Sequence, residues 1–228
     1  MSLFRLALAN LNLSRLSSLM NIILLALGTA SIATLLLASA QLSSTLTRNA
    51  AGIDMVIGAK GSPLQLVLAG VYHADVPPGN IPLAEIDRWQ LHPMVKMAVP
   101  LSIGDSYNGY RIVGTTTEFA ALYDTQLATG EYWHAPFQAV IGSQVAATTN
   151  LSINSRFEGV HGLTDGGDRH EQSSYQVVGQ LKATGSVLDR LIFTSLESVW
   201  QMHGDHSQDY ASTGDNAHTG ELQDKLQD

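Results

Sequence analysis

The sequence has no cysteine among its 228 residues. Without thiols, the chain has no disulfide framework, no thiolate metal site and no cysteine nucleophile. Any folded domain in it must be held together mainly by the burial of apolar side chains.

Basic residues are scarce and are not clustered. Twelve Lys and Arg face twenty Asp and Glu, which gives a formal net charge of -8. Because affinity for nucleic acid depends largely on clustered Lys and Arg, we expect no nucleic-acid partner. A phosphate loop is also missing, since Gly58-Ala59-Lys60-Gly61-Ser62 holds the right residue types in the wrong order. We therefore expect no cofactor in this chain and no ATP hydrolysis by it.

Charged residues are absent from one long apolar stretch near the N-terminus. Residues 16–47 contain no Asp, Glu, Lys or Arg, and a bilayer core requires roughly 20 mostly apolar helical residues. We predict a single transmembrane helix over residues 16–42, followed by a stalk or linker over residues 43–52. Residues 1–15 are predicted to form an amphipathic helix at the cytoplasmic face, because Arg5 and Arg15 favour a cytoplasmic N-terminus.

A cleaved signal peptide is the alternative to this anchor, because Ala38-Ser39-Ala40 matches an A-x-A cleavage pattern. The apolar run is longer than the roughly 7–15 residues of a signal core, which favours an uncleaved anchor. Either reading places the rest of the chain outside the cytoplasm. Within the helix, Gly28 and Ser31 could let a second membrane helix pack closely. Alternatively, Ser and Thr hydroxyls bond back to their own helix carbonyls.

The region 53–204 alternates short strand and helix patterns, which predicts an α+β domain built on a mixed or antiparallel sheet. Ser62-Pro63 is a strong helix start, and its helix is apolar enough that we expect it to be buried. Asn108-Gly109 favours a tight hairpin turn, predicted to join strands over 94–103 and 110–115. Further strands are expected over 53–58, 137–141, 155–160, 175–181 and 190–193, and further helices over 83–91, 117–122, 142–149 and 195–203.

Local sequence also predicts the structure of three other segments. Thr194-Ser195-Leu196-Glu197 resembles a capping box and should open the last helix. Residues 162–173 are polar and turn-rich, and are expected to form an exposed loop. Residues 205–228 are acidic with almost nothing to bury, which predicts a disordered tail.

The stretch Asp54-Met55-Val56-Ile57-Gly58-Ala59-Lys60-Gly61-Ser62-Pro63-Leu64-Gln65, after a membrane helix, resembles MacB/FtsX-type ABC transporter permeases. So does Thr184-Gly185-Ser186-Val187-Leu188-Asp189-Arg190. The resemblance covers nearly the whole chain up to Gly204, and its middle parts, such as Leu127 to Glu131, are generic. It identifies the following family-motif residues: Asp54, Gly58, Lys60, Gly61, Pro63, Gln65 and Asp189.

The resemblance implies a permease subunit of a bacterial inner membrane whose periplasmic core domain lies between its first and second membrane helices. It also implies a cytoplasmic ABC ATPase as partner, a second permease copy, and ATP-driven motion transmitted to the exported domain. Efflux and lipoprotein release are among the activities of such complexes. The sequence stops at Asp228 and does not include the final membrane helices that such a permease would have, so we expect a truncated, fragmentary or split subunit.

Histidine is the one unusual polar feature. His161, His170, His203 and His206 lie in or beside predicted loops with Asp and Glu nearby, which makes a zinc site conceivable. Their spacing matches no compact ligand template, so we expect solvated histidines and no metal. No G-x-S-x-G elbow holds a serine nucleophile either, and we expect no enzyme activity.

Two hypotheses of different class therefore remain. The first is a permease subunit that works with an ATPase and moves its periplasmic domain. The second is a free-standing anchored periplasmic protein that binds a ligand or metal without an ATPase. They differ in whether the membrane helix and the residues before it contact partner subunits.

Overall fold

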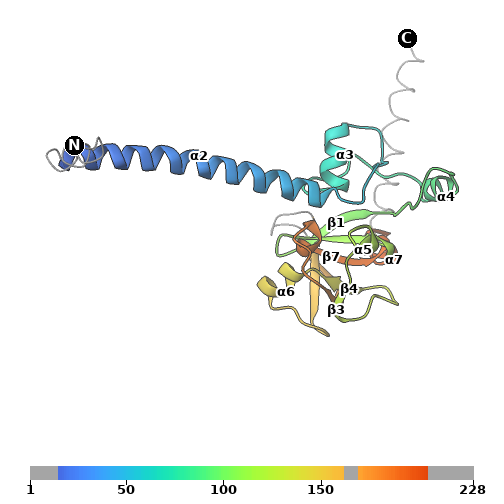
Figure 1. Cartoon of the computed structure of the whole chain (residues 1–228). Helices are drawn as coiled ribbons and strands as arrows, with labels where there is room; N and C mark the ends of the chain where they lie inside the picture. The colour runs from blue at the N-terminus through green and yellow to red at the C-terminus, as the bar shows by residue number, and fades with distance from the viewer. Residues whose placement is uncertain (1–14, 162–168, 205–228) are drawn as a thin grey trace, which may run out of the picture. The chain divides into compact units, whose positions relative to one another are not determined.

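The computed structural model describes residues 15–161 and 169–204, in two compact units that meet between Arg48 and Asn49 (Figure 1). The predictions for residues 1–14 and 205–228 lie outside the described residues. We describe the two units separately.

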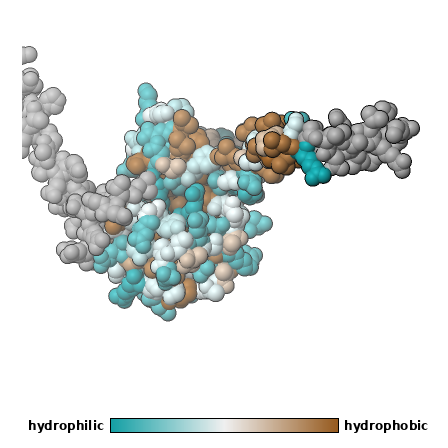
Figure 2. Space-filling model, turned by 90° about the vertical axis from the view of Figure 1, so that its left-hand side faces the viewer, coloured by the Kyte–Doolittle hydropathy of each residue, from teal (hydrophilic) through white to brown (hydrophobic). Residues whose placement is uncertain are grey.

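The first unit contains one long helix, α2 (Arg15–Asn49), of 35 residues. It is apolar enough to cross a membrane, and its most apolar window has no buried residue. Figure 2 shows brown, hydrophobic surface along it. At 1.5 Å per residue the helix is about 50 Å long, which exceeds the roughly 30 Å hydrocarbon core of a bilayer. The chain thus has one candidate membrane helix among its described residues.

The hydroxyl groups inside α2 bond to the helix itself. Ser31 Oγ donates to the Leu27 carbonyl at 2.8 Å, and Thr34 Oγ1 donates to the Ala30 carbonyl at 2.8 Å. Of the two roles considered for Ser31, the structure shows the intrahelical bond. Gly28 has open space around its Cα, and its packing against a second membrane helix stays a prediction.

The second unit is built on a seven-stranded mixed sheet with the order β3-β6-β4-β7-β2-β1-β5. The strands β2 and β7 run parallel, as do β4 and β6, and the other neighbours are antiparallel. Strand β5 also pairs with β6, so six of the strands close into a ring and β3 is added beside β6. The strands are β1 (Ser102–Tyr107), β2 (Tyr110–Thr115), β3 (Leu127–Gly130), β4 (Gln138–Ile141), β5 (Arg156–His161), β6 (Arg169–Leu181) and β7 (Leu191–Ser195).

Short helices accompany this sheet, which confirms the predicted α+β class. Helix α7 packs against β1, β2 and β7, and α6 packs against β6 and the 3-10 helix η1. The helices of this unit are α3 (Pro63–Gly70), α4 (Ala84–Gln90), α5 (Glu118–Leu122), α6 (Ser143–Thr149), η1 (Val187–Arg190) and α7 (Leu196–Gly204).

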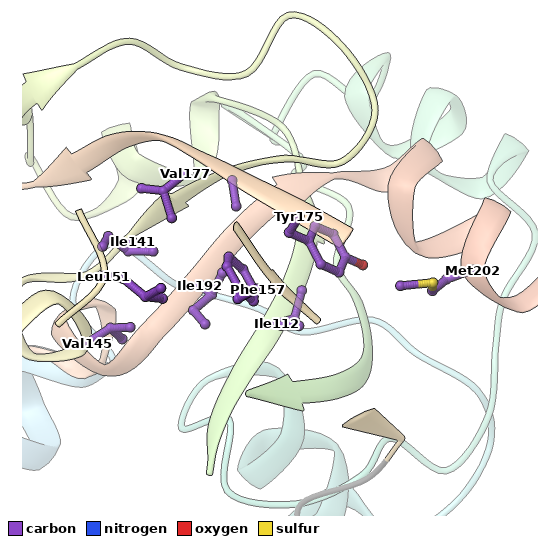
Figure 3. Close-up of a cluster of buried hydrophobic side chains, with 10 residues drawn as sticks. Ile112, Ile141, Val145, Leu151, Phe157, Tyr175, Val177, Ile192 and Met202 are labelled. Atoms are coloured by element: carbon purple, nitrogen blue, oxygen red, sulfur yellow. The ribbon is translucent and has the colours of Figure 1, made fainter. Parts of the chain in front are cut away.

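Both faces of the sheet carry a hydrophobic core, because neighbouring residues on a strand point to opposite faces. On β2, Ile112 joins one cluster and Val113 joins the other. The first cluster, drawn in Figure 3, includes the rings of Phe157 and Tyr175, which stack with centroids 5.4 Å apart. Its remaining members are Ala139, Ile141, Val145, Leu151, Val177, Ile192 and Met202.

The hairpin turn at Asn108-Gly109 is confirmed. Both residues have positive φ, 48° and 78°, as a two-residue turn of this kind requires. The preceding strand, however, runs over Ser102–Tyr107 and not over 94–103. Pro100 has no N–H to give to a strand ladder, so the strand begins only after it.

Residues 53–58 do not form the predicted strand. They run beside α3, where Val56 lies against Gly70 and Leu66 lies against Gly58. The apolar residues of this segment predict a strand, but Val56 instead contacts helix α3.

Two boundaries also differ from the prediction. Residues 169–173 belong to β6 rather than to a loop, because they extend the ladder in which Val160 pairs with Arg169. Helix α7 begins at Leu196, and the hydroxyl of Ser195, not that of Thr194, accepts the Ser198 amide at 3.2 Å.

The structure of the core predicts that Ile→Ala substitutions at two positions lower the free energy of unfolding by very different amounts. Ile192→Ala empties a site with 0% exposure at the centre of the sheet and should cost about 2–5 kcal/mol of unfolding free energy. Ile153→Ala, at a residue 36% exposed, should cost less than about 1 kcal/mol. Urea unfolding of the full chain in detergent micelles measures both values, and equal costs would contradict this description of the core.

Candidate functional site

Five residues from distant parts of the chain meet around the short helix α5, and we call this group the α5 junction. It consists of Asn49, His73, Phe119, Tyr123 and Phe193, all of which belong to the second unit. The junction brings together the last residue of α2, the segment after α3, and strand β7.

Asn49, the last residue of α2 and the first of the second unit, is held at this junction by a hydrogen bond. Asn49 is buried, and its backbone carbonyl accepts the Tyr123 hydroxyl at 2.9 Å. Burial raises the pKa of Tyr123 to about 12, with a smaller contribution from Tyr72. The phenol therefore keeps its proton, and remains a donor, at every physiological pH.

Gly52 lets the chain turn closely over α5. Its φ is +78°, and a Cβ at this position would lie 2.2 Å from the Leu122 carbonyl oxygen. A residue with a side chain would be strained by this φ and would also clash with backbone. The sequence therefore requires glycine three residues after the helix end.

Aromatic contacts continue from Tyr123 into the sheet. The ring of Phe119 lies 5.7 Å from that of Tyr123 and 5.7 Å from that of Phe193 on β7. Phe119 is only 2% exposed, so it forms a packed contact between the two. Edge and tilted arrangements at these separations are the favoured geometries for aromatic pairs.

His73 joins the junction from another side. Its ring meets Phe119 edge-on at 6.0 Å, and its backbone carbonyl accepts Arg111 Nε of β2 at 2.8 Å. Burial lowers the pKa of His73 to about 4, and the nearby Arg111 lowers it further in the same direction. The imidazole is thus neutral at pH 7.

The family-motif residues between Asp54 and Gln65 lie in one segment next to α3. Pro63 is the first residue of α3, and the Ser62 hydroxyl caps it by accepting the Gln65 amide at 3.5 Å, as predicted. Gln65 Nε2 also donates to the Val76 carbonyl at 3.0 Å, which ties the helix to the segment that follows it. Gly61 lies against Pro78. Asp54 and Lys60 are exposed.

Asp189 lies elsewhere, in η1, and organises the loop before it. Its carboxylate accepts the Thr184 amide at 2.9 Å and the Gly185 amide at 2.8 Å. This arrangement holds η1 in place while Val187 and Leu188 enter the second core cluster. The geometry gives Asp189 a positioning role within the fold.

Helix α3 is exposed, which corrects the prediction that it is buried. Only Ala69 is buried, whereas Leu64 is 67% exposed. The apolar composition is therefore not explained by packing within the described residues. A group of exposed apolar side chains surrounds it in sequence: Met55, Ile57, Val67, Val76, Ile81, Leu83, Leu91 and Met94. Exposed apolar side chains concentrated in one segment are typical of an interaction surface.

The side chains of the four histidine candidates are not among those that the structure describes, so the expectation of solvated histidines without a metal stays a prediction. The backbone of His161 ends β5, that of His170 lies in β6 and that of His203 lies in α7, whereas His206 is outside the described range. Among the side chains that the structure does describe, no group of three or more His, Asp or Glu could hold a metal ion.

The sequence predicted the short helix over 117–122 but not the junction that Phe119 and Tyr123 form. The contact between Tyr123 and Asn49 joins residues 74 positions apart. The one local signal in the sequence was Gly52, at the end of the predicted stalk.

Residues 18–228 match the family model described as the MacB-like periplasmic core domain. No curated protein sequence gives a significant match. The extracellular domain of the noncanonic ABC-type transporter YknZ from Gram-positive bacteria is similar in structure, with 12% identity, a TM-score of 0.40, and coverage of 64% of this chain and 75% of that one. The periplasmic region of MacB from Actinobacillus actinomycetemcomitans gives 11% identity, a TM-score of 0.42, and coverage of 68% and 72%.

The buried imidazole of His73 predicts acid sensitivity. Its pKa falls from 6.5 to about 4 in the folded chain, so between these values the unfolded chain binds the proton and the folded chain does not. Stability should therefore fall as the pH is lowered through this window, by up to about 3 kcal/mol.

His73→Asn removes this titration while tolerating the positive φ of 51° at this position. Urea midpoints of the full chain at pH 7 and pH 5 should therefore differ less in the variant than in the wild type. Equal pH dependence in the two proteins would show that His73 does not titrate as described.

Proposed function

Since the chain belongs to the MacB-like periplasmic core domain family, which makes its role transporter-associated, we propose that it is the membrane-anchored N-terminal part of an ABC transporter permease. In this proposal a separate cytoplasmic ATPase binds and hydrolyses ATP. In the same proposal the present chain catalyses no reaction itself and transmits motion to a domain outside the cytoplasm.

The observation that carries this proposal is the continuity of the family match across both units. It begins at residue 18, within the candidate membrane helix, and continues through the sheet domain. If the membrane helix served only to export the domain, a single family model would not need to cover both the helix and the domain. This continuity favours the permease over a free-standing binding protein.

The α5 junction supplies a physical route for the motion. A displacement of the end of α2 would act on the Asn49 carbonyl and therefore on Tyr123, which hydrogen-bonds to it. From Tyr123 the displacement would pass through Phe119 to Phe193 in β7. Close-packed side chains transmit displacement because interiors have low compressibility.

The exposed apolar side chains around α3 are where this proposal places contacts with other subunits. Leu64, Val67 and Met55 are 67%, 39% and 56% exposed, and burial of such surface drives association. A second permease copy is the partner that we propose for this surface.

The absence of cysteine gives a direct test of orientation. Single substitutions Ser2→Cys and Asp54→Cys place one thiol on each side of α2. In intact cells a membrane-impermeant maleimide should label Asp54→Cys, whereas Ser2→Cys should be labelled only after the membrane is permeabilised. The cysteine-free parent chain gives the background, and labelling of Ser2→Cys in intact cells would contradict a cytoplasmic N-terminus.

The partnership with an ATPase is tested by purification. The full chain, isolated in mild detergent from its own cells, should carry with it an ATPase that contains a Walker A motif. As a matched control, a chain whose residues 1–48 are replaced by an unrelated single-pass anchor should lose that ATPase while keeping the folded domain. If the intact chain is recovered alone, the anchored ligand-binding protein becomes the better account.

A further inference from the structure

Strand β3 lies outside the closed ring, and among the described residues it pairs only with β6. Each strand of the ring has a neighbour on both sides, whereas β3 has a neighbour on one side. Its residues Ala128, Thr129 and Gly130 are exposed. Strand edges are usually protected by charged residues, proline or a covering segment, because free backbone groups pair readily with another strand. This strand contains neither a charged residue nor proline.

The backbone of β3 directs a donor and an acceptor away from β6. The Lys182 amide donates to the Gln126 carbonyl at 3.0 Å, and the Glu131 amide donates to a carbonyl of β6 at 3.0 Å. In a trans peptide the N–H and the C=O point in opposite directions. The Leu127 N–H, which shares a peptide group with the Gln126 carbonyl, therefore points to the open edge. For the same reason the Gly130 C=O points there, because it shares a peptide group with the Glu131 amide.

This edge is complementary to itself under a two-fold axis. When two β3 strands pair antiparallel with Leu127 opposite Gly130, the outward N–H of each Leu127 meets the outward C=O of Gly130 in the other copy. An isologous contact of this kind forms every interaction twice. A shift by one residue would place Leu127 opposite Glu131, whose amide already donates to β6. The directions of the backbone groups thus select one register.

The same register brings opposite charges together at both ends of the contact. It places Glu131 of one copy opposite Gln126 of the other, and Lys182 Nζ donates to Oε1 of the Gln126 in its own chain at 3.3 Å. Side chains directly opposite each other on antiparallel strands have Cβ atoms about 4.5–5.5 Å apart, so the Lys182 ammonium can reach the Glu131 carboxylate. Both residues are exposed, and within its own chain Glu131 lies 3.7 Å from the exposed His134.

We propose that β3 pairs antiparallel with β3 of a second copy of this chain, with Leu127 opposite Gly130. The matching of backbone groups and of charges favours a second copy over an unrelated strand. A two-strand contact this short is marginal in water, but copies that α2 holds in one membrane have a high effective concentration. The inference rests on the proposed function in requiring a second copy, and it adds a contact to the one proposed for the α3 surface.

Disulfide cross-linking tests the register, because the chain has no cysteine. Two full chains with different tags are co-expressed, one with Gln126→Cys and the other with Glu131→Cys, and their membranes are treated with a mild oxidant. The two thiols lie directly opposite each other in the proposed pair, at a separation that suits a disulfide, so the mixed disulfide should form. Two chains that both carry Gln126→Cys should cross-link at least tenfold less, because their thiols lie five residues apart along the strands.

The charge pair is tested at the other end of the same dimer, where Glu131 of the first chain meets Lys182 of the second. Lys182→Glu in the second chain should lower the yield of the mixed disulfide about fivefold, because an attraction becomes a repulsion. Adding Glu131→Lys to the first chain should restore the yield. As a matched control, Arg156→Glu in the second chain, at an exposed residue of β5, should leave the yield unchanged.

Two results would overturn the proposal: a mixed disulfide no more abundant than the one between two Gln126→Cys chains, or no recovery when the charges are exchanged. The first result would leave the β3 edge to a strand of another protein. Co-purification with an ATPase tests the proposed function separately, and it can succeed without the cross-link. The cross-link can likewise form where no ATPase co-purifies.

Discussion

Closure of the sheet by β6 is the constraint on which the rest of the domain depends. This strand pairs with β5 through residues such as Tyr175, with β4 through Val177, and with β3 through Gly179. A ring of backbone hydrogen bonds removes most free strand edges and fixes which side chains share a face. Because the chain has no cysteine, this ring and the apolar clusters on its two faces hold the domain together without covalent links.

The α5 junction is built on this closed sheet, and so is a cleft of about 470 Å³ that Arg111 and Arg190 line. Arg111 leaves β2 to hold the His73 carbonyl, and so anchors the segment after α3 to the sheet. The same residue forms part of the cleft wall, while the ring of His73 packs against Phe119 of the junction. Displacement of the junction would therefore move one wall of the cleft.

Local signals predicted local features well. The turn at Asn108-Gly109, the cap at Ser62 and the apolar residues of α2 follow from chemistry within a few residues, and the structure confirms them. The strand predicted over 53–58 was wrong, because a sequence pattern shows which side chains are apolar but not whether a strand or a helix packs against them. The junction and the cleft were not predictable, because their contacts join residues 38 and 74 positions apart in sequence. Nothing in single-sequence periodicity encodes such pairings.

The hydrogen bond between Tyr123 and Asn49 also decides where the exported domain begins for protein engineering. The domain does not start at the first residue after the helix, because the helix's last residue supplies an acceptor to a half-buried phenol. A soluble version cut at Gly52 would lose that acceptor, and one cut shortly before Asn49 would keep it. The last residue of the anchor helix is therefore a structural part of the domain, and the boundary between the two cannot be drawn at the end of the helix.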